Sequence, residues 1–489
     1  MKKLLLGSLV VVFSLVTGWS DDRPNILLFT ADDLHANSLG VYGGKPVDLT
    51  PNLDAFAASG MLFRRAHVNA AICAPCRAII ATGRYSHRSG AMGFMPARPD
   101  VPDIVTTMQA GGYRAGILGK VPHSTPKTSM KWDYQFDQRE LGNGRNPKLY
   151  EERSAAFFES CKTEGKPFYF MVNSHDPHRP YCNPKKLTKG AAMPSKIYEA
   201  DEVEVPGFLP DLPGVRAELA QYLNSTRRLD DTFGSVMKAL DESGLAETTV
   251  VLFITDNGIA VPFAKCNSWF HSSHSPLLVR WPGKVEAGSE NRTHFVSVVD
   301  FFPTFLDITG VEGPDGLDGR SFLPLLRGEA QADRNHVFTQ IDSKAGGDAV
   351  PMRSVQTAQY GYIYNPFSDG KFWYRNNNEG KTMAAMNQAA ETDPAIKARV
   401  DLFRYRVPEE FYDLEKDPDC LINLIDSASH AAEIDKLREL LRVQMEKTDD
   451  PILTAFQNRD DRAVVDQVLE ATYGPRKSPK PRGKKKGKK

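Results

Sequence analysis

The sequence predicts an α/β fold with a doubly wound, mostly parallel sheet and a smaller C-terminal α+β subdomain. Three observations lead to this prediction. Short unbroken apolar runs end in polar clusters, helical patterns lie between these runs, and the chain changes to shorter strand-like segments after Gly310. Alternating strands and helices are typical of parallel sheets, in which ligands bind beyond the carboxyl ends of the strands.

Four apolar runs predict the central strands. They are residues 25–30 (NILLFT), 114–118 (RAGIL), 167–172 (PFYFMV) and 249–254 (TVVLFI). Polar residues follow each run: Asp32 and Asp33, Gly119 and Lys120, Asn173 to His175, and Asp256 and Asn257. Because parallel strands end at one edge of a sheet, we expect these four clusters to lie near one another.

Helices are expected over residues 51–59 with Thr50 as N-cap, over 102–110, and over 215–243 closed by Gly244. Strand-like segments at 352–356 and 360–364, followed by an amphipathic helix over 430–447, predict the C-terminal α+β unit. The expected division is a leader over 1–20, a catalytic domain over 21–319, the α+β subdomain over 320–455 and an extension over 456–489.

The composition is that of a globular protein, with 41% apolar and 25% charged residues, which excludes disordered, collagen-like and coiled-coil chains. The 61 basic and 61 acidic residues are unevenly distributed. Residues 474–489 carry nine positive and no negative charges, whereas residues 21–473 carry 50 positive and 61 negative ones. The tail is expected to be a disordered arm that improves solubility or tethers the protein to polyanions, and the acidic body argues against nucleic acid as a partner.

The N-terminus predicts export to the periplasm or the medium. Lys2 and Lys3 precede an apolar run over 4–16 and the small residues Thr17, Gly18 and Ser20, as in a secretory signal, and this run is shorter than the ~20 residues of a membrane span. No transmembrane anchor is expected. Export permits disulfides, and Cys161 with Cys182 is one possible pair, although the sequence leaves the connectivity open.

Asp32, Asp33, Asp256 and Asn257 offer oxygen ligands at two strand ends. Such ligands suit Ca²⁺ or Mg²⁺ better than zinc. Each residue alone could equally cap a following helix, but the two pairs together favour a metal site.

Cys73 and Cys76 form a C-x-x-C pattern, which raises the possibility of a redox dithiol or half of a zinc site. A zinc site would need a second pair, and a redox domain would be much smaller than the predicted sheet. A structural role is therefore expected for Cys76.

Cys73, Pro75 and Arg77, followed by Thr82 and Gly83, resemble the maturation signature of the sulfatase family in the alkaline-phosphatase-like superfamily. Segments 175–179 (HDPHR), 256–259 (DNGI), 276–279 (PLLV) and 351–356 (PMRSVQ) are similar to those of its N-sulfoglucosamine sulfohydrolase (sulfamidase) branch. The resemblance spans nearly the whole body of the chain.

The resemblance implies that Cys73 is oxidised to formylglycine by a formylglycine-generating enzyme or an equivalent maturase. It further implies a single Ca²⁺ held by Asp32, Asp33, Asp256, Asn257 and position 73, with Arg77 as stabiliser. A hydrated aldehyde suits the reaction because one hydroxyl can attack sulfur, while the other can lose a proton and expel sulfate by re-forming the carbonyl.

The same resemblance assigns the remaining site residues. Lys120 contacts sulfate, and His123 contacts the formylglycine hydroxyl although its spacing from Lys120 is three rather than the commoner two. Lys265 replaces an arginine of sulfamidase-like sequences and lacks the bidentate fork. His175 is expected to be the general acid, with His178 and Arg353 as substrate contacts; His271 and His274 are expected at the rim or in structural roles.

The expected activity is hydrolysis of sulfate esters or sulfamates of sulfated glycans, with N-sulfoglucosamine of heparan type as the leading substrate. O-sulfated algal or host polysaccharides remain open. Two other functions also remain open. The protein could be a phosphonate or phosphate monoester hydrolase of the same superfamily, or, if Cys73 is not oxidised, a non-catalytic polyanion-binding protein. The oligomeric state is left open.

Overall fold

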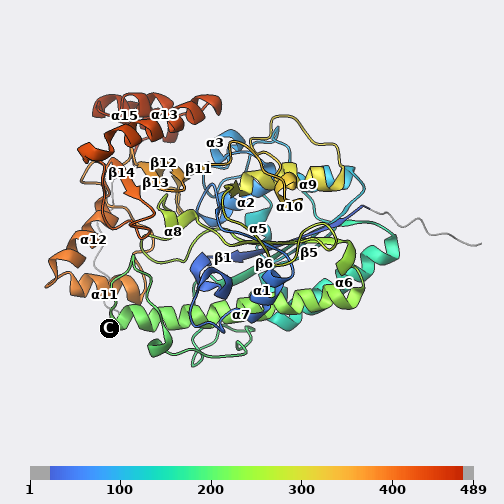
Figure 1. Ribbon diagram of the computed structural model, residues 1–489. Coiled ribbons are helices and arrows are strands. Elements are labelled where there is room, and N and C mark those ends of the chain that lie inside the picture. The colour runs from blue at the N-terminus through green and yellow to red at the C-terminus, as the bar shows by residue number, and fades with distance from the viewer. Residues whose placement is uncertain (1–22, 477–489) are drawn as a thin grey trace, which may run out of the picture.

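The computed structural model describes residues 23–476 (Figure 1). The expected leader and most of the basic tail lie outside these residues. The large sheet has eight strands in the order β5-β4-β6-β1-β7-β8-β2-β9. Their bounds are β1 Asn25–Asp32, β2 Met61–Phe63, β4 Arg114–Leu118, β5 Tyr134–Phe136, β6 Phe168–Pro177, β7 Thr249–Thr255, β8 Leu277–Arg280 and β9 Ser289–Asn291.

The centre of the sheet is parallel, which confirms the predicted fold class. Strand β1 pairs in parallel with β6 on one side and with β7 on the other, and β4 pairs in parallel with β6 and β5. Only β8 runs antiparallel to its neighbours β7 and β2. All four predicted strands are present. Strands β1 and β6 extend beyond the predicted ends into the polar clusters, whereas β7 ends at Thr255, directly before its cluster.

Helices cover both faces of the sheet. Their bounds are α1 Pro51–Ala58, α2 Cys73–Thr82, α3 Ser86–Ser89, α4 Ile104–Ala110, α5 Val121–Ser124, α6 Pro147–Glu164, α7 Pro213–Ser243, α8 Phe270–Ser273, α9 Phe301–Thr309 and α10 Leu323–Leu326. Helices α1 and α6, with the part of α7 from residue 229 to 240, pack on the face to which Leu27 and Phe29 point, whereas α2, α4 and α9 pack on the face of Ile26 and Leu28. Figure 1 shows the long α7 running beneath the sheet.

The structure refines two local predictions about helix starts. Thr50 is the N-cap residue of α1, as predicted, but its side chain makes no capping hydrogen bond, and its hydroxyl accepts the Gly40 N–H at 3.1 Å. The helix expected from residue 102 begins at Ile104, where the Asp103 carboxylate accepts the Thr106 N–H at 2.8 Å and so caps the first turn.

The C-terminal part holds a four-stranded antiparallel sheet in the order β11-β12-β13-β14. Its bounds are β11 His336–Ser343, β12 Ala349–Thr357, β13 Tyr360–Tyr364 and β14 Glu409–Asp413, with α11 Lys381–Ala389, α12 Pro394–Tyr405, α13 Ala431–Lys447, α14 Leu453–Gln457 and α15 Arg462–Tyr473. Val465 and Leu469 of α15 belong to the same apolar core as Val355 and Leu437. The packed unit therefore continues to Tyr473, past the predicted end at residue 455.

All six cysteines lie in the described part of the chain and are free thiols, so the suggested Cys161–Cys182 disulfide is absent. Cys161 is buried in α6 within the apolar core beneath the sheet, and the backbone N–H of Cys182 donates to Ser225 of α7. Within residues 23–476, no helix combines the length and apolarity needed to cross a membrane.

Candidate active site

The site lies where β1 and β7 end side by side. Asp32 is the last residue of β1, and Asp256 and Asn257 directly follow β7. Asp33 has a positive φ of 70°, and its N–H donates to the Asp256 carboxylate at 3.2 Å. The Asn257 amide donates to Asp33 Oδ1 at 2.7 Å, so the two pairs predicted from the sequence meet in space.

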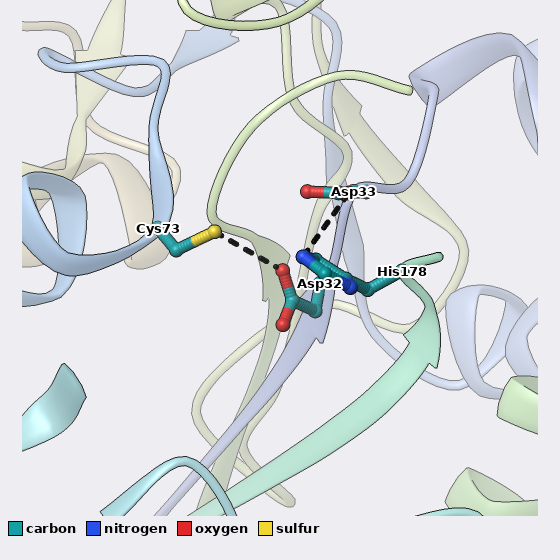
Figure 2. A group of neighbouring side chains, drawn as sticks. All are labelled: Asp32, Asp33, Cys73 and His178. Atoms are coloured by element: carbon teal, nitrogen blue, oxygen red, sulfur yellow. Dashed lines mark hydrogen bonds and ion pairs between the residues drawn. The ribbon is translucent and has the colours of Figure 1, made fainter. Parts of the chain in front are cut away.

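Cys73 begins helix α2 and reaches the same place from a different element (Figure 2). Its Sγ lies 3.5 Å from Asp32 Oδ1 and 3.4 Å from Lys265 Nζ. Asp32, Asp33, Cys73 and His178 each present a ligand atom within 4.8 Å of the others. In Figure 2 the His178 ring faces Asp33, and its Nε2 is 3.9 Å from Asp33 Oδ2.

Arg77 lies one helical turn after Cys73 and is completely buried. Its Nε and Nη2 donate to Asp256 Oδ2 at 3.0 and 2.8 Å, and its Nη1 donates to Thr30 and Asn173. A buried guanidinium needs such partners, because an unpaired charge in this environment is costly. Arg77 therefore joins the ends of β1, β6 and β7 to the helix that carries Cys73.

Lys120 and Lys265 supply further positive charge. Lys120 pairs with Asp32, and Lys265 pairs with Asp33. Burial acts to lower the pKa of each lysine, but the adjacent carboxylates outweigh it and raise both pKa values, so both ammonium groups remain charged. Burial likewise opposes ionisation of Asp32, yet Lys120, His178 and Arg77 hold its pKa well below its usual value.

The donor set fits a hard divalent cation. Asp33 Oδ2 and Asn257 Oδ1 are buried and have no hydrogen-bond partner. Burial and the neighbouring Asp32 raise the pKa of Asp256 to about 7, which reflects carboxylates crowded together away from water. Oxygen ligands with unused lone pairs are those that Ca²⁺ prefers.

The two thiols of the C-x-x-C pattern are poor redox groups. Burial, followed by the charge of Asp32, raises the pKa of the Cys73 thiol, and burial raises that of Cys76 well above its usual value. Both thiols therefore stay protonated. Because the thiolate is the reactive form, the unmodified cysteines are unreactive. Cys76 is fully buried in the apolar core, in keeping with its expected structural role.

A pocket of about 290 Å³ opens beside this cluster. It is lined by Lys120, Pro122, His123, Asp137, Gln138, Arg145, His175, His178, Arg179 and Pro180. Burial lowers the pKa of His123 to about 4, so its ring is neutral near pH 7. Burial also lowers the pKa values of His175 and His178, although the charge of Asp32 acts in the opposite direction on both. Of the two histidines in the HDPHR segment, only His178 belongs to the group around Cys73.

Arg353 is not brought to this cluster. Its guanidinium is buried between Asp450 and Asp342, to which it donates, and it lines a separate small cavity with His87 and Thr448. The structure thus gives Arg353 a structural role within the C-terminal subdomain, in place of the expected substrate contact.

His271 and His274 are buried. His271 lies between His35 and Asp419 at 3.1 and 3.0 Å, and His274 Nε2 lies 3.0 Å from the carbonyl oxygen of Arg64. These buried hydrogen-bonded positions favour the structural role for both histidines over a position at the rim of the site.

Two residues that shape the site, Asn173 and Arg145, lie in no sequence motif that would have identified them as site residues. Asn173 of β6 accepts from Thr30 of β1 and from Arg77, and it donates to the carbonyl groups of Leu118 and Gly119 at the end of β4, so it connects three strands. Its position after a predicted strand was a usable signal. Arg145 comes from a loop, and only the fold places it beside Asp176 and the pocket.

Comparison with known proteins identifies the family. The Sulfatase family profile matches residues 24–311, more than half of the chain. The chain belongs to the sulfatase family. It is a sulfatase, a sulfuric ester hydrolase, and the profile described as "N-sulphoglucosamine sulphohydrolase, C-terminal" matches residues 262–399.

Individual relatives agree with this assignment. The chain is 29% identical to human N-sulphoglucosamine sulphohydrolase, with 95% of this chain and 97% of that protein covered. It is 27% identical to an ulvan-active sulfatase of Formosa agariphila, with 81% and 75% covered.

Solved structures share the fold at lower identity. A protein in complex with its substrate D-glucosamine-2-N,6-O-disulfate has a TM-score of 0.65 at 19% identity, covering 88% of this chain and 98% of that one. A phosphonate monoester hydrolase of Agrobacterium radiobacter has a TM-score of 0.63 at 19% identity, covering 87% and 96%.

Proposed function

We propose that this sulfatase is exported and removes sulfate groups from sulfated glycans, with N-sulfoglucosamine of heparan type as its leading substrate. The observation that carries the proposal is the placement of Cys73, the first residue of α2, in contact with both Asp32 and Lys265. The C-terminal profile and the human relative favour an N-sulfated sugar over other substrates.

In this proposal Asp32, Asp33, Asp256 and Asn257 hold Ca²⁺, and position 73 carries formylglycine made from Cys73 by a maturase. Together these two groups would supply a metal-activated hydroxyl nucleophile, which the protonated thiol cannot provide. The unpartnered oxygens of Asp33 and Asn257 support the metal part of the proposal.

The charged side chains of the chain then act on the sulfate. Lys120 and Lys265 would bind its oxygens and stabilise negative charge during transfer. His123, neutral at pH 7, can hydrogen-bond the hydroxyl at position 73. Arg77 orients Asp256 by two hydrogen bonds to one carboxylate oxygen, and its charge favours the ionised form of Asp256.

The leaving sugar needs a proton, and two pocket histidines could donate it. The resemblance implies His175, but the ring of His178 lies within the group around Cys73 and faces Asp33. We therefore propose that His178 donates the proton in its protonated form, which the charges of Asp33 and Asp32 favour, with His175 as the neighbouring wall of the pocket.

Mass spectrometry of the tryptic peptide containing position 73 tests the nucleophile. Conversion of Cys73 replaces the thiol by an aldehyde and lowers the mass of the peptide. A fully active preparation with an unaltered thiol would contradict the proposed mechanism, and an inactive one that binds heparin would favour a polyanion-binding protein.

A panel of N- and O-sulfated disaccharides tests the substrate. Released sulfate is expected to be highest for N-sulfoglucosamine. Preference for O-sulfated sugars would favour the alternative supported by the ulvan-active relative, and faster turnover of an aryl phosphate than of an aryl sulfate would favour a phosphoesterase.

Export rests on the N-terminal sequence alone. Cell fractionation and the N-terminal mass of the purified protein test it, since cleavage is expected near residue 20. Full-length protein in the cytoplasm would contradict export.

A further inference from the structure

The pocket beside Cys73 contains a cation that the proposed reaction does not use. We propose that Arg179 binds a second anionic group, a sulfate or a carboxylate, on the sugar whose sulfate is removed or on its direct neighbour. This inference rests on the proposed function and narrows its substrate class to sugars with two anionic groups.

Arg179 lines the pocket and has donors to spare. Its Nε and Nη2 donate to the Ala260 carbonyl at 3.0 and 2.9 Å, and its Nη1 donates to Glu218. A guanidinium has five N–H groups, so two remain without a protein acceptor. The side chain is 27% exposed, which leaves these donors accessible from the pocket.

The guanidinium is held firmly in place. Glu218 is buried on α7 and also accepts the backbone N–H groups of Lys381 and Thr382 at 3.2 and 2.8 Å, so it ties Arg179 to the start of α11. The Arg179 guanidinium also lies 4.6 Å from the centre of the Tyr181 ring. An anchored cation loses little conformational entropy when it binds an anion.

Gly380 leaves room for this arrangement. A Cβ at this position would lie 2.7 and 2.9 Å from the terminal nitrogens of Arg179, and the backbone has a φ of 98° that disfavours other residues. Glycine at this position therefore lets the C-terminal subdomain pack closely against the arginine.

The other pocket arginine differs from Arg179. Arg145 is only 6% exposed and donates to Asp176 and to the carbonyl groups of Asn143, His178 and Arg179. Its contacts hold the loop in shape. Of these two arginines, Arg179 is the one placed for a ligand.

The position of Arg179 sets where the second anion must be. Arg179 directly follows His178, whose ring faces the carboxylates beside Cys73. A pocket of about 290 Å³ lies at the lower end of the ~300–1,000 Å³ typical of small-molecule sites, which suits one sugar unit. A planar guanidinium matches the geometry of sulfate and carboxylate oxygens.

Equilibrium binding tests the inference without requiring turnover. Calorimetry on Cys73→Ser protein would compare D-glucosamine 2-N-sulfate, its 2-N,6-O-disulfate, and a disaccharide that joins the N-sulfated sugar to a uronic acid. We expect the doubly anionic ligands to bind more tightly, and Arg179→Gln to reduce this preference by about 10- to 100-fold. The ligand with the larger loss identifies sulfate or carboxylate as the second anion.

Two further variants and one control separate a binding role from a structural one. Arg179→Lys keeps the positive charge but lacks the paired N–H groups of the guanidinium, so it should lose part of the preference for doubly anionic ligands. Glu218→Gln should give an intermediate loss of this preference. Arg442→Gln removes a cation from the exposed face of α13, where it pairs with Glu439 and Glu446, and should leave the preference unchanged. Circular dichroism checks that each variant is folded.

An equal loss of affinity for all three ligands in Arg179→Gln, or an unchanged preference, would overturn the inference. So would the absence of binding of any of these sugars to the Cys73→Ser protein. In that case turnover of an aryl sulfate by the matured enzyme would still support the proposed sulfatase mechanism, so the two failures are distinguishable.

Discussion

Two buried arginines in this protein, Arg77 and Arg353, look alike in local chemistry but have different surroundings. Arg353 lies between Asp342 and Asp450, and its two carboxylate partners complete a closed ion-pair network. Arg77 pairs with Asp256 in a cluster where Asp33 Oδ2 and Asn257 Oδ1 remain unpartnered. A satisfied network serves stability, whereas buried polar atoms left open indicate a site that another group completes.

Replacing each arginine by methionine should give the largest effects. Either change leaves buried carboxylates unpaired and should lower the free energy of unfolding by about 3–5 kcal/mol. Arg77→Met should also abolish sulfate release, whereas folded Arg353→Met should retain activity per molecule. Denaturant unfolding and turnover on an aryl sulfate measure both quantities, and complete inactivity of well-folded Arg353→Met would contradict the structural role.

Replacing the two pocket histidines should distinguish proton donation from pocket shape. His178→Ala should lower kcat on a sugar substrate by about 10²- to 10⁴-fold, the usual contribution of a general acid, and His175→Ala should have a smaller effect. A substrate with a good leaving group needs no proton, so an aryl sulfate should largely escape the loss. A larger loss of kcat in His175→Ala than in His178→Ala would indicate that His175 is the proton donor.

Removing Ca²⁺ from the proposed metal site should destabilise the protein. An ion that binds only the folded state adds about 2.7 kcal/mol when its concentration is 100 times its Kd, and chelation by EGTA should remove this contribution. The midpoint of thermal unfolding should fall and recover when Ca²⁺ is added back. Asp33→Asn protein provides the control, because its midpoint should respond much less to Ca²⁺.

Acidification should give the smallest of these effects on stability, through the protonation of one buried histidine. Burial lowers the pKa of His274 to about 4, below its ordinary value of 6.5. The unfolded chain therefore binds the proton first, and stability falls as the pH decreases from about 6.5 towards 4. Between pH 7 and pH 5 this residue should account for about 2 kcal/mol of lost unfolding free energy.

Urea unfolding of His274→Gln protein at several pH values measures this contribution. The decrease in stability between pH 7 and pH 5 should be smaller than in the unaltered protein by about the stated amount. The same decrease in both proteins would show that other groups, such as the buried His35 and His67, dominate the acid response.

The amino-acid sequence by itself determined the local features of this protein. Unbroken apolar runs located the four central strands, and the residues after them included Asp32, Asp33, Asp256 and Asn257, because parallel strands buried on both faces must be apolar and must end at a common edge. The signature around Cys73 further pointed to the family that the comparisons establish.

Only the tertiary structure decided which distant side chains meet. Arg353 and Arg179 both lie in segments similar to those of the sulfamidase branch, yet Arg353 is enclosed by Asp342 and Asp450 while Arg179 keeps unused donors towards the pocket. The decisive partners, Asp450 for Arg353 and Glu218 for Arg179, lie 97 and 39 residues away along the chain. Local sequence patterns describe interactions between near neighbours, so contacts across such separations are set by how the sheet, α7 and the C-terminal subdomain pack together.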